Sequence, residues 1–122
     1  MSGYPALALL ALVSTMADAA QLPLKPGTYV LAGTACKDPP FAATLSYDGR
    51  AFSYPHATGC RSAVAAHNGK TYKIAETCSA LGDGTPARAH TLTATYTVDS
   101  RTRLVIRKAG EKGRSLYRWC GQ

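Results

Sequence analysis

Apolar and polar residues alternate with a period of two along most of the chain, which is typical of β-strands. The clearest case is HTLTATYTV at 90–98, where every second residue from Leu92 to Val98 is apolar and the others are threonines. GTYVLAG at 27–33, RLVIRK at 103–108 and RSLYRWC at 114–120 also read as strands. Together with the hairpins described next, they predict seven or eight short strands. We expect an all-β fold, a small antiparallel β-barrel or sandwich built as a meander.

Turn residues separate these apolar runs at short intervals. Asp48-Gly49 and Asn68-Gly69 each stand between two β-prone runs and predict tight hairpins, in which both central residues would have positive φ. Residues 99–102 and 109–113 predict two further turns, and residues 80–88 a longer loop. SAVAAH at 62–67 suits a helix because of its alanines, but the Asn-Gly that follows suits a hairpin equally well.

The first residues have a different pattern. ALALLALV at 6–13 is a continuous apolar run, and ADAA at 17–20 follows it. This pattern predicts a secretory signal peptide over residues 1–19, cleaved after Ala19; the alternative is a buried N-terminal helix. The run is shorter than the roughly 20 apolar residues of a membrane-spanning helix. We therefore expect no membrane span, a single domain over 20–122, and export to the bacterial periplasm or the exterior.

The four cysteines fit this compartment. Cys36, Cys60, Cys78 and Cys120 all lie beyond the predicted cleavage site, and an even number in an exported domain predicts two disulfides. Their spacing contains no C-x-x-C, which argues against zinc or redox chemistry. Of the three pairings, we favour Cys36–Cys60 with Cys78–Cys120, because the second bond would tie the tail to the middle of the chain.

The chain is strongly basic. It has 14 Lys and Arg against seven acids, a formal charge of +7, which becomes +8 when Asp18 is removed with the signal peptide. Such a charge keeps a small domain dispersed and attracts anionic partners over a long range. It does not specify which anion.

The last hairpin concentrates this charge. A turn centred on Gly110 and Glu111 would place Arg107 opposite Arg114 and Arg103 opposite Arg118 on one face. Opposed like charges destabilise a sheet, so a neighbouring acid, guanidinium stacking or a bound anion should compensate. Arginine suits phosphate, sulfate or carboxylate because its fork binds two oxygens. We predict an anion- or partner-binding surface here; the alternative is a solvated face. The opposite, core-forming face carries Leu104, Ile106, Tyr117 and Trp119.

Alternation also places Cys120 on the arginine side of this hairpin. Two arrangements would accommodate it. Either the strand bulges at its end, or the arginine face is partly covered where Cys120 meets its partner.

The sequence carries no recognisable catalytic motif. His56, His67 and His90 are far apart, and five of the six acids beyond Asp18 fall in predicted turns. Glu76 is the acid that lies within a predicted strand, where we expect a salt bridge to an arginine. We predict no catalytic residues, no metal and no cofactor.

Three functions follow, in order of preference. The first is a small, monomeric, non-enzymatic binding or inhibitor-type protein of unidentified partner, either a protein or an anionic ligand, that uses the arginine surface. The second is a binder of a polyanion such as nucleic acid, lipopolysaccharide or an acidic glycan, which salt would weaken steeply. The third is a small hydrolytic enzyme, which would need histidines or carboxylates converging in a pocket.

Overall fold

The computed structural model describes residue 3 and residues 22–122, so the signal peptide predicted over residues 1–19 falls outside the described residues apart from Gly3. The described chain is all-β, as predicted, and forms a single antiparallel sheet. One 3₁₀ turn, η1 (Phe41–Ala43), precedes the second strand. The eight strands are β1 (Gly27–Leu31), β2 (Thr44–Tyr47), β3 (Phe52–Ser53), β4 (Ala57–Asn68), β5 (Thr71–Leu81), β6 (Pro86–Ser100), β7 (Arg103–Lys108) and β8 (Ser115–Gly121).

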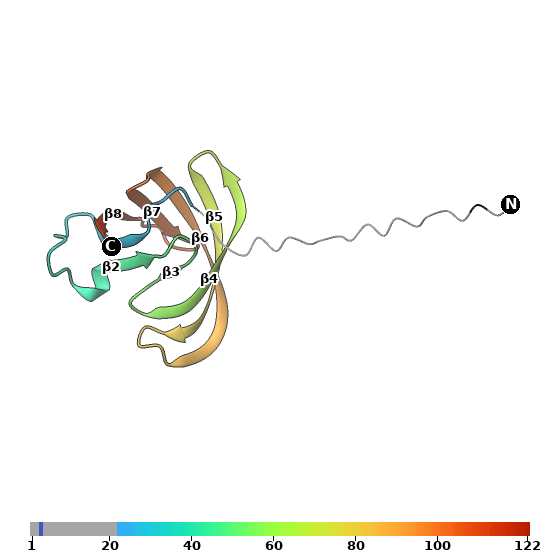
Figure 1. The fold of residues 1–122 in the computed structure, drawn as a ribbon, viewed down its shortest axis with the longest axis horizontal. Helices are drawn as coiled ribbons and strands as arrows, with labels where there is room; N and C mark the ends of the chain where they lie inside the picture. The colour runs from blue at the N-terminus through green and yellow to red at the C-terminus, as the bar shows by residue number, and fades with distance from the viewer. Residues whose placement is uncertain (1–2, 4–21) are drawn as a thin grey trace.

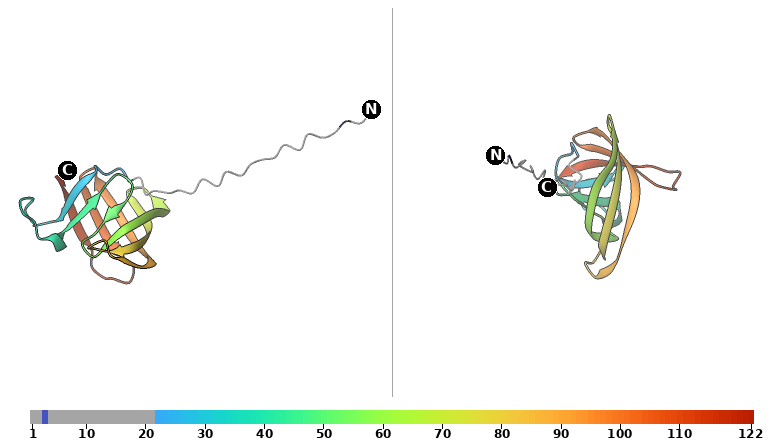
Figure 2. Two further views of the ribbon diagram at one scale, coloured as in Figure 1. Left: turned by 60° about the horizontal axis from the view of Figure 1, so that its bottom comes forward. Right: turned by 90° about the vertical axis from the view of Figure 1, so that its right-hand side faces the viewer.

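The sheet curls into a nearly closed barrel (Figures 1 and 2). Each strand pairs with the next along the chain from β4 to β8, and β1 pairs with both β2 and β8. β3 and β4 are the two edge strands of the sheet, and a short turn joins them, in which Tyr54 and Ala57 form an isolated bridge. The meander is therefore a barrel rather than a sandwich.

Both predicted hairpins form, but with a different turn geometry. β2 and β3 flank the turn at Asp48-Gly49, and β4 and β5 flank the turn at Asn68-Gly69. Only the glycines have positive φ, 98° at Gly49 and 59° at Gly69. The first turn is held instead by the Asp48 carboxylate, which accepts the backbone N–H groups of Arg50 and Ala51 at 2.7 Å each. Residues 62–67, which also suited a helix, belong to β4.

The barrel interior holds the hydrophobic core. Its largest fully buried side chains come from β1, β2 and β3, where Tyr29, Tyr47 and Phe52 are at most 2% exposed. The alternation predicted for 90–98 is confirmed in its second half, where Tyr96 and Val98 are buried, Ala94 packs against the core and the threonines between them are half-buried; Leu92 is 61% exposed. Further buried residues of this core are Leu22, Leu24, Leu45, Ile74, Leu104 and Ile106.

The segment that leads into β1 closes one end of the barrel. Leu22 and Leu24 are buried in the core, and the Leu22 backbone N–H donates to the Tyr47 hydroxyl at 3.0 Å. The Tyr29 hydroxyl donates to the Lys25 carbonyl at 2.7 Å. Trp119 Nε1 donates to the Pro26 carbonyl, and the Lys25 ammonium lies 4.7 Å from the centre of the Trp119 ring. The opposite end of the barrel has no such plug among the described residues.

Two disulfides form, but the pairing favoured from the sequence is wrong. Cys36 bonds to Cys120, and Cys60 bonds to Cys78. The physical reason is the barrel itself. Pairing of β1 with β8 brings the loop after β1 to the end of the chain, whereas Cys60 and Cys78 are directly opposite each other in the β4–β5 hairpin.

The disulfides also bear on the compartment, since such bonds persist in oxidising environments. Within residues 22–122, no helix has the length and apolar character needed to cross a membrane.

Candidate functional site

The open end of the barrel contains a cavity of about 520 Å³. Most of its wall comes from β5, β6 and β7. Ile74, Tyr96 and Ile106 form its buried part. Leu81 and Leu92, which are 49% and 61% exposed, also line it. We call this space the barrel cavity.

The rim of the barrel cavity is built around a tight backbone contact at Gly82. A Cβ atom on Gly82 would lie 1.6 Å from the Pro55 carbonyl oxygen, so only glycine fits without a shift of one of the two segments. This contact seats the β5–β6 loop directly on the turn between β3 and β4. That turn carries Tyr54 and His56, both of which line the cavity.

A network of hydrogen bonds around Glu76 lies in the wall of the barrel cavity. The Tyr54 hydroxyl donates to Glu76 Oε2 at 3.0 Å, and the Ser62 hydroxyl donates to the same oxygen at 2.9 Å. The hydroxyl of Tyr96 is hydrogen-bonded to that of Tyr54. We call these four residues, Tyr54, Ser62, Glu76 and Tyr96, the Glu76 network. The salt bridge to an arginine that we expected for Glu76 is absent from the described residues.

The second carboxyl oxygen of Glu76, Oε1, is not fully buried. Oε1 has no hydrogen-bond partner among the described residues. Every fully buried side-chain nitrogen or oxygen of those residues does have a partner. Oε1 is therefore accessible, and the space that Glu76 lines is the barrel cavity.

Burial controls the ionisation of the Glu76 network. It raises the pKa of Glu76 above the usual 4.5, although the hydrogen bonds from Ser62 and Tyr54 and the nearby charge of Lys108 act in the opposite direction. The pKa values of Tyr54 and Tyr96 are also raised, mainly by burial. Both tyrosines thus remain neutral hydrogen-bond donors at physiological pH, and Glu76 is the group of this network that titrates closest to neutrality.

The Cys60–Cys78 disulfide lies beside Glu76. The two sulfurs and a Glu76 carboxylate oxygen are within 4.8 Å of one another, a grouping of the kind that binds metal ions. Metal binding by cysteine requires the thiolate, and both sulfurs are committed to the disulfide. This cluster does not fit a metal site while the disulfide is intact.

Two of the three histidines, His56 and His90, line the barrel cavity together with Glu76 and Glu111. The sequence reasoning did not foresee this convergence. The nearby Ser62 hydroxyl donates to Glu76, and among the described residues no hydrogen bond joins a serine to His56 or His90. His67 lies elsewhere, stacked on Tyr72 with ring centres 4.0 Å apart.

The predicted arginine surface forms only in part. The register of the last hairpin is as expected, with Arg103 opposite Arg118, but the ladder ends at Ile106 and Ser115. Arg107 therefore lies beyond the paired part and Arg114 lies in the turn before β8. All four arginines are exposed. The opposite face is confirmed as core, since Leu104 and Ile106 are buried and Tyr117 and Trp119 pack against them.

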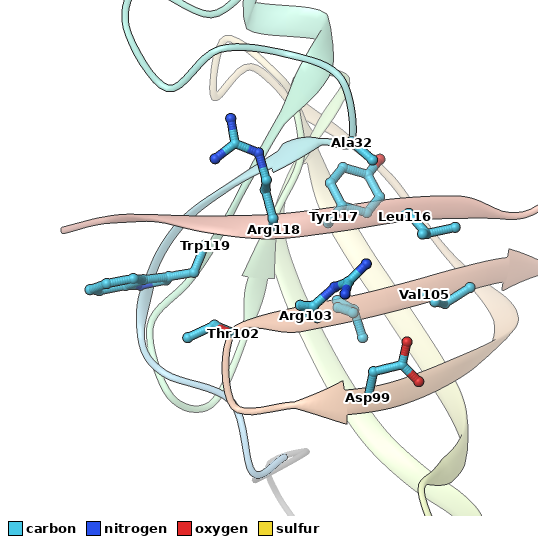
Figure 3. Close-up of a pocket in the computed structure, with 10 residues that line it drawn as sticks. Ala32, Asp99, Thr102, Arg103, Val105, Leu116, Tyr117, Arg118 and Trp119 are labelled. Carbon is cyan, nitrogen blue, oxygen red and sulfur yellow. The ribbon is translucent and has the colours of Figure 1, made fainter.

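Arg118 has a structural contact that explains its position. Its guanidinium donates to the Thr34 carbonyl at 2.6 Å and contacts Cys36 Sγ at 3.2 Å, so it fastens the loop that the Cys36–Cys120 disulfide ties down. Both arrangements considered for Cys120 are present: the β1–β8 register shifts at Cys120, between the Thr28–Gly121 and Tyr29–Trp119 pairs, and Arg118 is partly covered by the loop that carries Cys36. Figure 3 shows the Arg118 guanidinium pointing away from Arg103, so the two like charges diverge.

A shallow depression of about 300 Å³ lies beside these two arginines. Arg103 and Asp99 line it on the outer surface, together with Val105 of β7 and Leu116 of β8 (Figure 3). The side chains of Arg103 and Arg107 make no hydrogen bond or ion pair within the described part of the chain. Of the four predicted arginines, these two lie on β7 with side chains available to a ligand.

The fold and its cavity define a small, disulfide-bonded β-barrel that is plugged at one end and hollow at the other. Comparison of the chain with family models, with curated proteins and with solved structures finds no match.

Proposed function

We propose that the protein is an exported, non-enzymatic binding protein that holds a small amphipathic molecule in the barrel cavity. The observation that carries this proposal is the cavity of about 520 Å³ at the open end, with apolar side chains and a hydrogen-bonded carboxyl group in its wall. Ligand sites are commonly concave and mostly apolar, with a few fixed polar groups. Eight-stranded barrels are wide enough inside to hold one small ligand.

Leu81 and Leu92 support this proposal. These two large apolar side chains lie on the neighbouring strands β5 and β6, and because they are about half exposed they contribute little to folding. They would contribute to binding by removing the apolar part of a ligand from water.

Two features support export. The apolar run at 6–13 followed by small residues has the form of a signal peptide. The two disulfides require an oxidising compartment to persist.

The arrangement of polar groups supports binding rather than hydrolysis. A nucleophilic serine needs a base that takes its proton, and Ser62 is instead a donor to a carboxyl group. We expect a bound ligand to be recovered chemically unchanged. Hydrolysis of a p-nitrophenyl ester by the purified protein, abolished by His56→Ala and His90→Ala, would favour the enzyme alternative.

Filling the barrel cavity tests the proposal. Ala80 lines the cavity and Ala63 is exposed on the outer face of β4, so Ala80→Phe and Ala63→Phe form a matched pair. The probe is N-phenyl-1-naphthylamine, an apolar dye whose fluorescence rises out of water. We expect saturable binding to the wild type and to Ala63→Phe, and affinity weakened by about tenfold or more in Ala80→Phe. No saturable binding, or equal binding by all three proteins, would contradict the proposal.

A second candidate is a polyanion-binding surface on the outside of the barrel, at Arg103, Arg107 and Arg114. The observation that favours it is that the side chains of Arg103 and Arg107 have no hydrogen-bond or ion-pair partner within residues 22–122. The whole chain also carries a formal charge of +7, which attracts anions. Arg118 is left out of this surface because it holds the Thr34 carbonyl.

Retention on immobilised heparin tests this second candidate. The variant replaces Arg103, Arg107 and Arg114 by Gln, and the control replaces Arg50, Arg61 and Arg88, three exposed arginines on other elements. Elution of the first variant at lower salt than the control would support a localised surface. Equal elution of the two would show that net charge alone determines retention.

A further inference from the structure

The hydroxyl donors of the Glu76 network all lead toward the Glu76 carboxyl group. Because Tyr54 donates its proton to Glu76 Oε2, the bond between the two tyrosines requires Tyr96 to donate to Tyr54. Ser62 adds a second donor to the same oxygen. Every protein donor of the network therefore points toward the carboxyl group, an arrangement that orients a carboxylate and occupies one of its oxygens.

The remaining oxygen, Oε1, is the acceptor that the network leaves to the cavity. Lys108 is near enough to lower the pKa of Glu76, but no ion pair between the two is present among the described residues. A donor arriving from the cavity can therefore reach Oε1 without displacing a protein group. A positively charged donor would gain most, since it would also offset the burial of the carboxylate.

The cavity lining near Glu76 suits the apolar part of a ligand. Ile74, Ala94 and Ile106 lie around it inside the barrel, and Leu81 and Leu92 continue the apolar lining. A ligand with one charged end and an apolar remainder would place its charge at Glu76 and its apolar part against these side chains.

We propose that the ligand of the barrel cavity is a small amphiphile with a protonated amine, which donates to Glu76 Oε1 while its apolar body lies against Leu81 and Leu92. This inference rests on the proposed function and names the chemical class of its ligand. A fatty acid or another anion would instead meet the negative charge of Glu76.

Ligands of one chain length separate the head groups. The probes are n-octylamine, n-octanol and octanoate, each used to displace N-phenyl-1-naphthylamine from the purified protein at neutral pH. We expect octylamine to bind about tenfold more tightly than octanol, and octanoate to bind most weakly, because a charge-assisted hydrogen bond exceeds a neutral one.

Glu76→Gln keeps the size and an acceptor oxygen of the side chain but removes its charge. It should reduce the affinity for octylamine to that for octanol. The control, Asp38→Asn, removes the same charge from the loop after β1, at a position with φ of 48° that asparagine tolerates. It should leave the preference for octylamine unchanged.

The pH dependence of the wild type gives a second readout if Glu76→Gln does not fold. The preference for octylamine should fall as pH is lowered and Glu76 takes up a proton. The neighbouring groups are the neutral Tyr54 and Tyr96, the cation Lys108, and Glu111, His56 and His90. The same fall should persist in His56→Gln/His90→Gln, which removes the two histidines that line the cavity.

The outcomes separate the two proposals. If none of the three octyl compounds displaces the dye and the dye itself does not bind, the proposed function fails. If all three displace it equally, or octanoate displaces it best, the cavity binds ligands and the amine inference is overturned. A preference for octylamine that survives in Glu76→Gln also overturns it.

Discussion

At the scale of single residues, Glu76 is surrounded by side chains from three separate parts of the barrel. Tyr54 follows β3, Ser62 lies on β4 and Tyr96 lies on β6. The sequence marks Glu76 as unusual because it is the one acid within a predicted strand. It does not identify the partners, because Tyr54 and Tyr96 are 42 residues apart and meet only when the sheet curls. The parity of β5, with Ile74, Glu76 and Cys78 on one face, could have placed Glu76 inside.

Replacing Glu76 should change how stability depends on pH. Burial raises the pKa of the folded-state carboxyl above 4.5, so the folded protein holds this proton more tightly than the unfolded chain does. The stability that this group contributes is therefore present at low pH and is lost as pH rises toward the raised pKa. We expect urea denaturation to show wild-type stability falling relative to Glu76→Gln as pH rises from 4.5 through the raised pKa of Glu76. A difference between the two proteins that stays constant with pH would argue against this burial effect.

At the scale of the elements, the sequence predicts the local turns but not which distant strands pair with each other. The Asn68-Gly69 turn fixes the β4–β5 hairpin, and Cys60 and Cys78 lie at nearly equal distances on either side of it. Extending that hairpin brings Cys60 within one position of Cys78, and a register shift between Val64 and Ala66 places the two directly opposite each other. The loop predicted over 80–88 is shorter in the structure, because β5 continues to Leu81 and β6 begins at Pro86.

The Gly82 contact leads to a prediction about the cavity rim. In Gly82→Ala, the new methyl group would overlap the Pro55 carbonyl, so the β5–β6 loop and the turn that carries His56 must separate. We expect weaker binding of N-phenyl-1-naphthylamine with the core packing retained. Gly84→Ala is the control for the same loop, since a Cβ at Gly84 meets no atom within 4 Å, although its φ of 86° is also strained. Equal loss of binding in both variants would point to loop strain rather than to the Pro55 contact.

At the scale of the whole molecule, the feature that the sequence did not supply is closure of the barrel. Alternation and turns predicted seven or eight short strands, yet they say nothing about pairing between the first and the last. That pairing determines the Cys36–Cys120 bond, the contact of Arg118 with Thr34, and the plug beneath Trp119. It also leaves the other end open, which places the candidate site inside the barrel rather than on the arginine surface.

The two disulfides should differ in their contribution to stability. Cys36–Cys120 closes a loop with a sequence separation of 84 and Cys60–Cys78 one of 18. Loop entropy in the unfolded chain then gives about 4.5 kcal/mol for the first and about 3 kcal/mol for the second. We expect Cys36→Ala/Cys120→Ala to lose more unfolding free energy in urea than Cys60→Ala/Cys78→Ala. The reverse order would show that packing around the buried Cys60 outweighs loop entropy.

The most direct test of a ligand site inside the barrel is an NMR titration of the isotope-labelled protein with N-phenyl-1-naphthylamine. We predict saturable amide shifts concentrated at the open end, in residues 54–57 and 74–81 and around Leu92 and Ile106. The outer positions Arg103, Val105 and Leu116 should shift little. Shifts centred on those outer positions, or no saturable shifts at all, would contradict a binding site in the barrel cavity.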